Sequence, residues 1–234
     1  MTSSSPNSRV LLIGASRGLG YAIAEEYLSA GARVMATVRG SARTALHALA
    51  DAAGGRLEIE HLDINVPEEI QALRQRLTGR CFDLLFVNAG VASRTAETVA
   101  DVATDEFVRL MVTNALSPMR VVETLGDVVT ADGTIAVMSS GQGSIANNTN
   151  GNFEIYRASK SALNQLMRSY AARHHNDQRT LLLMAPGWVR TDLGGPHARL
   201  SIDESIPRLV GIVDAQCGRS GLQYLDYQGN TVAW

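Results

Sequence analysis

Lysine is almost absent from this chain. The 234 residues include 21 Lys and Arg residues, and Lys160 is the only lysine among them. Cysteine is scarce as well: Cys81 and Cys217 lie far apart in the sequence and form no metal-binding or redox motif. We expect both to be reduced, structural thiols of a cytoplasmic protein. Adjacent His174 and His175 would point in different directions on a helix, so no metal site is expected.

An excess of charge of one sign and a long apolar run are also missing. The formal net charge is −2, so no basic excess favours nucleic acid or an anionic membrane as a partner. No apolar run approaches the length of a membrane span, and residues 1–8 are too polar for a signal peptide. We expect residues 1–8 to be disordered or extended. No linker or repeat interrupts residues 9–234, which we expect to form a single domain.

Short apolar runs alternate with helical patterns along the chain. Continuous apolar runs such as Val10–Ile13 are typical of strands that are buried on both faces of a sheet. The predicted strands are 10–13, 33–38, 57–62, 83–88, 134–139, 180–185 and 222–227. The predicted helices are 20–30, 41–53, 67–77, 104–129, 156–174 and 203–216. This alternation predicts an α/β fold of the Rossmann type, with a doubly wound, mostly parallel seven-stranded sheet and helices on both faces.

A glycine-rich turn follows the first predicted strand. Its spacing is Gly14-x-x-x-Gly18-x-Gly20, and a helical pattern begins at its end. Glycines between a strand and a helix let the backbone approach a pyrophosphate closely, and the amino end of the helix attracts its charge. We therefore expect a dinucleotide to bind here, in contact with the turn and with Ser16 and Leu19 within it.

The second predicted strand indicates which dinucleotide binds. A free ribose 2′-hydroxyl is usually bound by an acidic residue at the end of this strand. The sequence there is Ala36-Thr37-Val38-Arg39, without an acid, and Arg17 adds a second cation in the glycine turn. Two guanidinium groups suit a 2′-phosphate, so the sequence favours NADP(H).

Tyr156 and Lys160 have the spacing of neighbours on one helix face. An ammonium beside a phenol favours the phenolate, so we expect Lys160 to lower the Tyr156 pKa from its usual value of about 10. A phenol with a lowered pKa can donate and accept a proton near neutral pH. Such pairs are also common on surface helices, so the spacing alone does not establish this role.

The ordered set of motifs resembles the short-chain dehydrogenase/reductase family over essentially the whole chain. The residues that carry the resemblance are Gly14, Gly18, Gly20, Asn88-Ala89-Gly90, Asn114, Ser140, Tyr156, Lys160, Pro186-Gly187 and Thr191. The stretch 186–192 and the ending 227–234 resemble the subgroup of small carbonyl reductases that includes the C-factor and sniffer proteins.

The resemblance implies a role for each motif residue in a dinucleotide-binding and catalytic domain. Tyr156 would be the general acid and base, and Ser140 would bind the substrate carbonyl oxygen. Lys160 would hold the nicotinamide ribose, and Asn114 would anchor a relay water. The remaining contacts implied for the cofactor are Asp63 and Ile64 at the adenine, Asn88, Ala89 and Gly90 along the adenosine, and Thr191 with the backbone near Val189 at the carboxamide.

Two site residues depend on arguments of their own. Spacing from Tyr156 would favour Ser144 as the serine, whereas position at a strand end favours Ser140, which we choose. Asn114 lies four residues before Pro118, and proline has no N–H to bond the Asn114 carbonyl. We expect a kink there and a water on the Asn114 main-chain oxygen.

The substrate is the least constrained expectation. Plausible pocket residues are Gln142, Ile145, Phe153, Trp188 and Leu193, although Phe153 and Trp188 suit core packing equally well. An apolar pocket favours hydrophobic ketones or aldehydes, and residues 194–206 would form a mobile lid.

The resulting expectation is an NADPH-dependent carbonyl reductase that forms a homo-oligomer. Alternatives are a 3-oxoacyl thioester reductase, an alcohol dehydrogenase, and an NADP(H)-sensing signalling protein.

Overall fold

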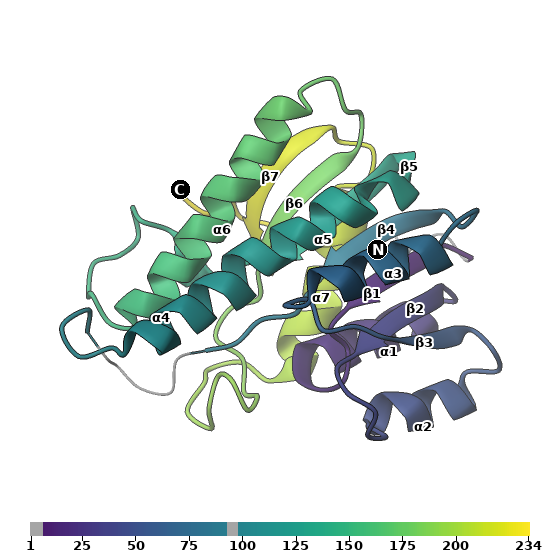
Figure 1. Ribbon diagram of the computed structural model, residues 1–234, viewed down its shortest axis with the longest axis horizontal. Helices are drawn as coiled ribbons and strands as arrows, with labels where there is room; N and C mark the ends of the chain where they lie inside the picture. Colours follow the sequence, from purple (N-terminus) through teal and green to yellow (C-terminus); the bar gives the residue numbers. More distant parts are fainter. Residues whose placement is uncertain (1–6, 93–97) are drawn as a thin grey trace.

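One parallel sheet of seven strands forms the centre of the computed structural model, which describes residues 7–92 and 98–234 (Figure 1). The strand order is β3-β2-β1-β4-β5-β6-β7, and every neighbouring pair is parallel. The strands are β1 (Arg9–Ile13), β2 (Arg33–Val38), β3 (Leu57–His61), β4 (Phe82–Val87), β5 (Val129–Met138), β6 (Thr180–Ala185) and β7 (Gly221–Asp226). The predicted Rossmann-type architecture is confirmed. Residues 1–6 of the expected disordered or extended segment lie outside the described residues.

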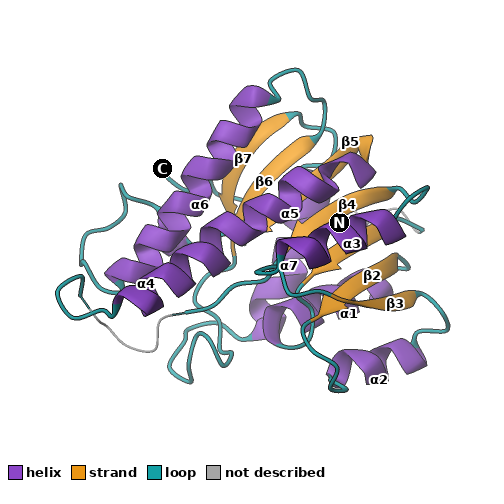
Figure 2. Cartoon of the chain, in the orientation of Figure 1, coloured by secondary structure: helices purple, strands orange, loops and turns teal. Residues whose placement is uncertain are grey.

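Helices cover both faces of the sheet (Figure 2). One face packs against α3 (Pro67–Arg76), α5 (Ser117–Leu125) and α6 (Glu154–Arg173), and α4 (Thr104–Met111) precedes α5 on this side. The other face packs against α1 (Gly18–Ser29), α2 (Ala45–Ala52) and α7 (Ile202–Ala215). Successive strand residues point to opposite faces, so Leu85 lies in the first core layer and Phe86 in the second. Both layers are apolar, which explains why the strands read as continuous apolar runs. In the described part of the chain, no helix is long and apolar enough to cross a membrane.

The predicted helix 104–129 is wrong as a single α-helix. A π-helical turn, Val112–Leu116, separates α4 from α5, and a 3₁₀ turn, Gly126–Val128, ends the run. Pro118 gives the physical reason, because it can donate neither the α-type bond to the carbonyl of Asn114 nor the π-type bond to that of Thr113. The expected kink is therefore a widened turn, and it carries Asn114 at its centre, fully buried.

Four other helix starts differ from the prediction; α1 begins two residues earlier, at Gly18, and α7 one residue earlier, at Ile202. Helix α2 begins at Ala45 instead of 41, because Thr44 caps it: the Thr44 N–H donates to the His47 ring, and Thr44 accepts from the His47 backbone. Helix α6 begins at Glu154, two residues earlier than expected, directly after Phe153 in the left-handed conformation with φ of +58°.

The expected site residues follow the carboxyl ends of adjacent strands. The glycine turn follows β1, Asn88 follows β4, and Pro186 follows β6 directly. Ser140 follows β5 with one residue, Ser139, in between. These four strands are neighbours in the centre of the sheet. Parallel strands end at the same edge, so the fold itself gathers these segments.

Candidate active site

The glycine turn after β1 leaves no room for side chains at two of its glycines. A Cβ on Gly20 would lie 2.1 Å from the main-chain oxygen of Gly14. Gly14 has φ of +88°, and a Cβ there would lie 2.9 Å from the Cα of Ala89. Gly14 therefore demands glycine by conformation and by space, and Gly20 by space alone. The backbone at the start of α1 is therefore bare of side chains at these positions and forms a cradle that fits a pyrophosphate.

Neighbouring strand ends hold this turn in place. The Gly14 N–H donates to Thr37 Oγ1 over 2.9 Å, and Asn88 Nδ2 donates to the Gly14 carbonyl over 2.7 Å. The Ala15 N–H donates to the Thr37 carbonyl over 2.8 Å. Thr37 was not predicted as a site residue. Its signal was present in the sequence, since it lies within the strand end where an acid is missing.

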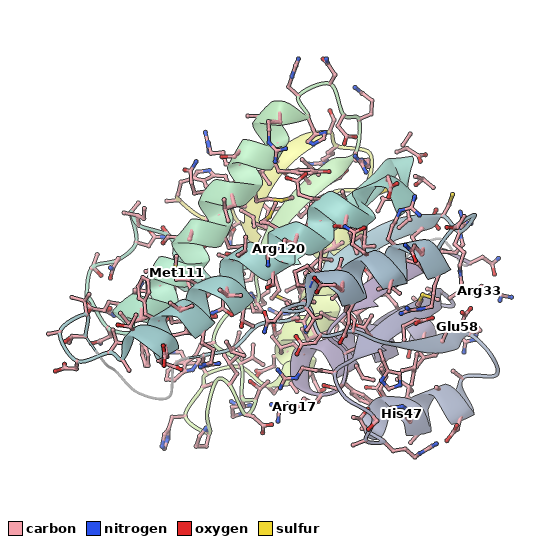
Figure 3. The ribbon with its side chains drawn as sticks, viewed as in Figure 1. Arg17, Arg33, His47, Glu58, Met111 and Arg120 are labelled. Atoms are coloured by element: carbon pink, nitrogen blue, oxygen red, sulfur yellow. The ribbon has the colours of Figure 1, made fainter. Side chains whose placement is uncertain are left out.

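Two arginines lie near this edge, as the sequence predicted, but their surroundings differ. Arg39 is exposed and has no hydrogen-bonding or ionic partner within residues 7–92 and 98–234. Arg17, labelled in Figure 3, pairs with Asp192, with 2.9 Å between Nη1 and Oδ2. Both side chains are more than three-quarters exposed. Asp192 therefore links the loop after β6 to the glycine turn, a contact that the sequence did not reveal.

Asp63 and Ile64 follow β3 and differ in accessibility. Ile64 is buried in the core, so only its backbone is available to a ligand. Asp63 Oδ1 accepts from the Asn65 N–H over 2.9 Å, and the carboxylate is half-buried. Asn65 also accepts from Ser117 Oγ over 2.8 Å, which ties this strand end to the start of α5.

Asn114 uses its side chain to hold the segment after β4. Its Oδ1 accepts from the Val91 N–H and its Nδ2 donates to the Val91 carbonyl, both over 2.8 Å. The same Nδ2 donates to Ser159 Oγ of α6 over 3.0 Å. The Asn114 side chain is therefore satisfied by protein groups. The water expected on its main-chain oxygen stays a prediction.

Lys160 is the most unusual charged group of the site. It is 3% exposed, and its ammonium donates to the carbonyl of Met138 over 2.9 Å. No acidic group pairs with it in the described part of the chain. Burial disfavours the charged form and lowers the Lys160 pKa to about 8. A Cβ on Gly90 would lie 3.6 Å from Lys160 Nζ and 3.3 Å from Asn114 Oδ1, so the last two groups meet at Gly90.

Tyr156 lies beside Ser140, and its pKa does not follow the prediction. Burial raises the Tyr156 pKa to about 12, although a hydrogen bond with the Ser140 side chain lowers it and Tyr224 raises it further. Lys160 is not among the groups that shift it. The expected lowering by Lys160 is therefore wrong for the protein by itself, because desolvation of the phenolate outweighs the favourable contacts. At neutral pH, Tyr156 is a protonated phenol.

The three serines near the end of β5 have distinct environments. Ser140 Oγ lies within hydrogen-bonding reach of Tyr156 and also accepts from the Gln142 N–H over 3.2 Å. Ser139 Oγ is buried and donates to Asn164 Oδ1 over 2.6 Å. Ser144 is 1% exposed, and its Oγ accepts from the Asn147 N–H over 3.1 Å. Of the three, Ser140 is the one whose hydroxyl meets the tyrosine.

The loop after β6 packs against the glycine turn. A Cβ on Gly18 would lie 3.8 Å from Thr191 Cγ2. Thr191 Oγ1 accepts from the Gly194 N–H over 3.0 Å, and the Pro186 carbonyl accepts from Ser205 Oγ over 2.6 Å. Pro186 and Val189 are buried, and Gly187 has φ of +81°. These contacts fix the loop at both of its ends.

The predicted pocket residues lie mostly on the surface. Ile145, Phe153, Trp188 and Leu193 are all exposed, with exposed fractions from 44% to 74%. Core packing of Phe153 and Trp188 is therefore excluded. Trp188 Nε1 donates to the Gly194 carbonyl over 2.8 Å. Gln142 is half-buried within a 3₁₀ turn. Whether these five residues contact a substrate stays a prediction.

The segment expected to be a lid is partly helical. Helix α7 begins at Ile202, so only residues 194–201 precede it as a loop. The Leu200 N–H donates to the Trp188 carbonyl over 3.0 Å, and the Arg190 N–H donates to the Leu200 carbonyl over 2.9 Å. This pair of bonds closes the base of the loop.

Comparison with known proteins gives consistent results. The family model described as enoyl-(acyl carrier protein) reductase matches residues 14–205. A solved structure of a short-chain dehydrogenase/reductase from Burkholderia multivorans with bound NADP is 60% identical, covers 98% of this chain and 100% of its own, and has a TM-score of 0.96. The carbonyl reductase Sniffer of D. melanogaster is 26% identical, with 98% and 100% coverage and a TM-score of 0.89. The C-signal protein of Myxococcus xanthus is 35% identical over 65% of this chain and 92% of its own length.

Gly20→Ala tests the cradle. We expect loss of NADPH binding by more than about tenfold in Kd, since the added methyl group must displace the Gly14 carbonyl. Intrinsic protein fluorescence with added NADPH measures the Kd. Gly211→Ala is the matched control, because Gly211 also lies within a helix and a Cβ there meets nothing within 4 Å. Equal affinity in both variants would contradict the assignment of the cradle.

Proposed function

The chain belongs to the short-chain dehydrogenase/reductase family of oxidoreductases, and we propose that it reduces a ketone or aldehyde to an alcohol with NADPH, reversibly. The observation that carries this proposal is the pair of hydroxyls of Ser140 and Tyr156, with the buried Lys160 one helical turn after Tyr156 on α6. All three lie at the carboxyl edge of the sheet, next to the glycine cradle. Carbonyl reduction needs a bound dinucleotide, a hydrogen-bonded carbonyl oxygen and one proton.

The residues of the cofactor site fit NADP(H). The cradle at Gly14 and Gly20 offers backbone without side chains and a helix start for the pyrophosphate. Thr37 stands within the strand end where NAD-binding sites carry an acid, and it holds the turn instead of a ribose. Arg39 has no partner among residues 7–92 and 98–234, which suits binding of a 2′-phosphate, and the Burkholderia relative was solved with NADP bound. When bound, the nicotinamide supplies the hydride, and the chain supplies the binding site, the hydrogen bonds to the carbonyl oxygen and the proton.

Proton donation to the substrate oxygen is the step of the reaction that the chain's own residues carry out. Because the Tyr156 pKa is about 12, the phenol carries its proton at neutral pH and is ready to donate it. Negative charge develops on the carbonyl oxygen as it is reduced, and Ser140 and Tyr156 together stabilise it by hydrogen bonds. Lys160 would hold the nicotinamide ribose, and its charge would ease the loss of the Tyr156 proton as that proton is transferred. Asn114 holds the segment of Gly90 and Val91 against Lys160, and its main-chain oxygen is the proposed water site for returning the proton.

The apolar rim favours hydrophobic carbonyl compounds. Ile145, Phe153, Trp188 and Leu193 present large apolar side chains to solvent near the carboxyl edge. Exposed apolar surface of this kind suits uncharged substrates with apolar groups. The Sniffer relative is named a carbonyl reductase, which agrees with this substrate class. We further propose a homo-oligomer in the cytoplasm.

Tyr156→Phe tests the proton donor. We expect kcat for carbonyl reduction to fall by about 10²- to 10⁴-fold, the usual contribution of a general acid. The Kd for NADPH should stay within about twofold, because the ring remains. NADPH consumption is followed with a panel of ketones, aldehydes, 3-oxoacyl thioesters and enoyl thioesters, and alcohol oxidation with NADP⁺. Near wild-type turnover in Tyr156→Phe would rule out this donor. Tight NADPH binding by the wild-type protein without turnover of any compound would favour the sensor.

The pH dependence of cofactor binding tests Lys160. Its pKa of about 8 means that the ammonium is charged below pH 8 and neutral above it, so NADPH should bind more weakly as pH rises from 8 to 10. We expect a loss of about fivefold, since a charged donor is worth about 1 kcal/mol more than a neutral one. Lys160→Arg keeps its charge, so its Kd, although higher, should stay flat over this range. A parallel decline in both proteins would show that another group titrates.

Asp192→Asn tests the competition for Arg17. The Asp192 carboxylate occupies a guanidinium that would otherwise be available to the 2′-phosphate. Since exposed ion pairs are worth at most about 1 kcal/mol, the Kd for NADPH should fall by about two- to fivefold. The Kd for NADH should not change. Asp203→Asn, which removes an exposed charge from the start of α7, is the control. Equal tightening for NADH and NADPH would contradict the competition.

A further inference from the structure

Tyr224 is a buried residue of β7 whose hydroxyl reaches the active-site edge. The residue is 1% exposed. Its hydroxyl donates to the main-chain oxygen of Ser140 and also lies within reach of the side chains of Ser139 and Asn164. Ser140 has extended backbone, with φ of −163° and ψ of 146°. A bond to its carbonyl fixes the peptide plane that follows, and with it the direction of the Ser140 side chain.

The segment after β7 folds back to cover Tyr224. The Val232 N–H donates to the Tyr224 carbonyl over 2.8 Å, and Leu225 forms an antiparallel bridge with Thr231. The Trp234 ring then lies against the Tyr224 ring, with 5.5 Å between centroids and 56° between planes. The guanidinium of Arg168, on α6, lies 4.7 Å from the centroid of the Trp234 ring. The Trp234 ring therefore packs against Tyr224 and is itself held in place by Arg168 of α6.

The same segment also holds the loop that begins at Ser140. The Ala146 N–H donates to the main-chain oxygen of Trp234 over 3.0 Å. Between these points, the Gly143 carbonyl accepts from Ser161 Oγ over 3.0 Å and from Asn164 Nδ2 over 3.2 Å. The loop is thus fixed at three places, by β7, by α6 and by the returning segment.

We propose that Tyr224 is a positioning residue that aligns the Ser140 hydroxyl with Tyr156, and that Trp234 maintains this alignment by supporting Tyr224 and the adjoining wall of the substrate site. The proposal rests on the proposed carbonyl reduction for its kinetic consequences. Tyr224 touches neither substrate nor cofactor and acts through Ser140. The physical requirement is strict, because a displacement of about 1 Å at a reacting group can cost about 10²-fold in rate.

The sign of the pKa change in Tyr156 separates positioning from a direct effect. The Ser140 hydrogen bond lowers the Tyr156 pKa, whereas Tyr224 raises it. If Tyr224→Phe only removes a neighbouring hydroxyl, the Tyr156 pKa falls. If it releases Ser140, the lowering hydrogen bond is lost and the pKa rises. The pH profile of alcohol oxidation with NADP⁺ reports this pKa, because the reaction needs the phenolate as base.

Three variants test the proposal. Tyr224→Phe should lower kcat by about tenfold while the KM for NADPH stays within about twofold, and its oxidation profile should shift to higher pH. Trp234→Leu keeps the main-chain bond to Ala146 but removes the ring, so a loss of about threefold in kcat is expected in the same direction. Tyr170→Phe is the matched control, since it removes a hydroxyl from another tyrosine buried in the same core layer, on α6, and should leave kcat unchanged.

Hydrogen–deuterium exchange of residues 139–152 gives a second readout that needs no turnover. Faster exchange in this segment is expected for Tyr224→Phe and Trp234→Leu but not for Tyr170→Phe. Unchanged exchange together with wild-type kcat, or an oxidation profile shifted to lower pH, would overturn the proposal while the carbonyl reduction stands. If the wild-type protein reduces no carbonyl compound, the proposed function fails, and the exchange rates alone decide whether Tyr224 holds the Ser140 loop.

Discussion

Burial of the Lys160 ammonium without an acidic partner in the described chain is the constraint on which the site depends. The fall in its pKa from 10.5 to about 8 corresponds to about 3 kcal/mol of folding free energy at neutral pH. Between pH 8 and 10.5, Lys160 is protonated in the unfolded chain but neutral in the folded protein. The destabilisation is therefore complete at neutral pH, shrinks as the pH rises through this range, and is absent above pH 10.5. The sheet provides the compensation, since the large apolar layer on one of its faces holds α6 and therefore Lys160 in place.

The buried cation also explains the roles of its neighbours. The Met138 carbonyl accepts from it, and Asn114 and Gly90 close around it. Burial raises the pKa of Tyr156 and lowers that of Lys160, so the protein by itself holds a protonated phenol one helical turn from the lysine on α6. Ser140 is the second hydroxyl of the proposed site, and we propose that it reaches Tyr156 because Tyr224 holds its loop. The proposed chemistry therefore depends on contacts from β5, β7, α6 and the turn around Asn114.

Local sequence patterns predicted most of this arrangement, with errors where long-range contacts decide. The strands were found because buried apolar runs are continuous, and the glycine turn because its spacing is specific. The kink at Pro118 was expected, but its form as a π-helical turn, with the Asn114 side chain bonded to Val91, was not. The Tyr156 pKa was predicted in the wrong direction, because helical spacing gives proximity but not desolvation.

The sequence by itself determined the order of strands and helices, the glycine cradle, and the identity of the groups that follow each strand. These are local properties, set by residue type and spacing along the chain. Only the tertiary structure decided that Ser140 meets Tyr156, that Asp192 holds Arg17, and that Trp234 returns to cover Tyr224. These three contacts join residues that are 10, 16 and 175 positions apart in the sequence. Their distances follow from how the sheet brings separate loops to one edge, and no local pattern encodes that.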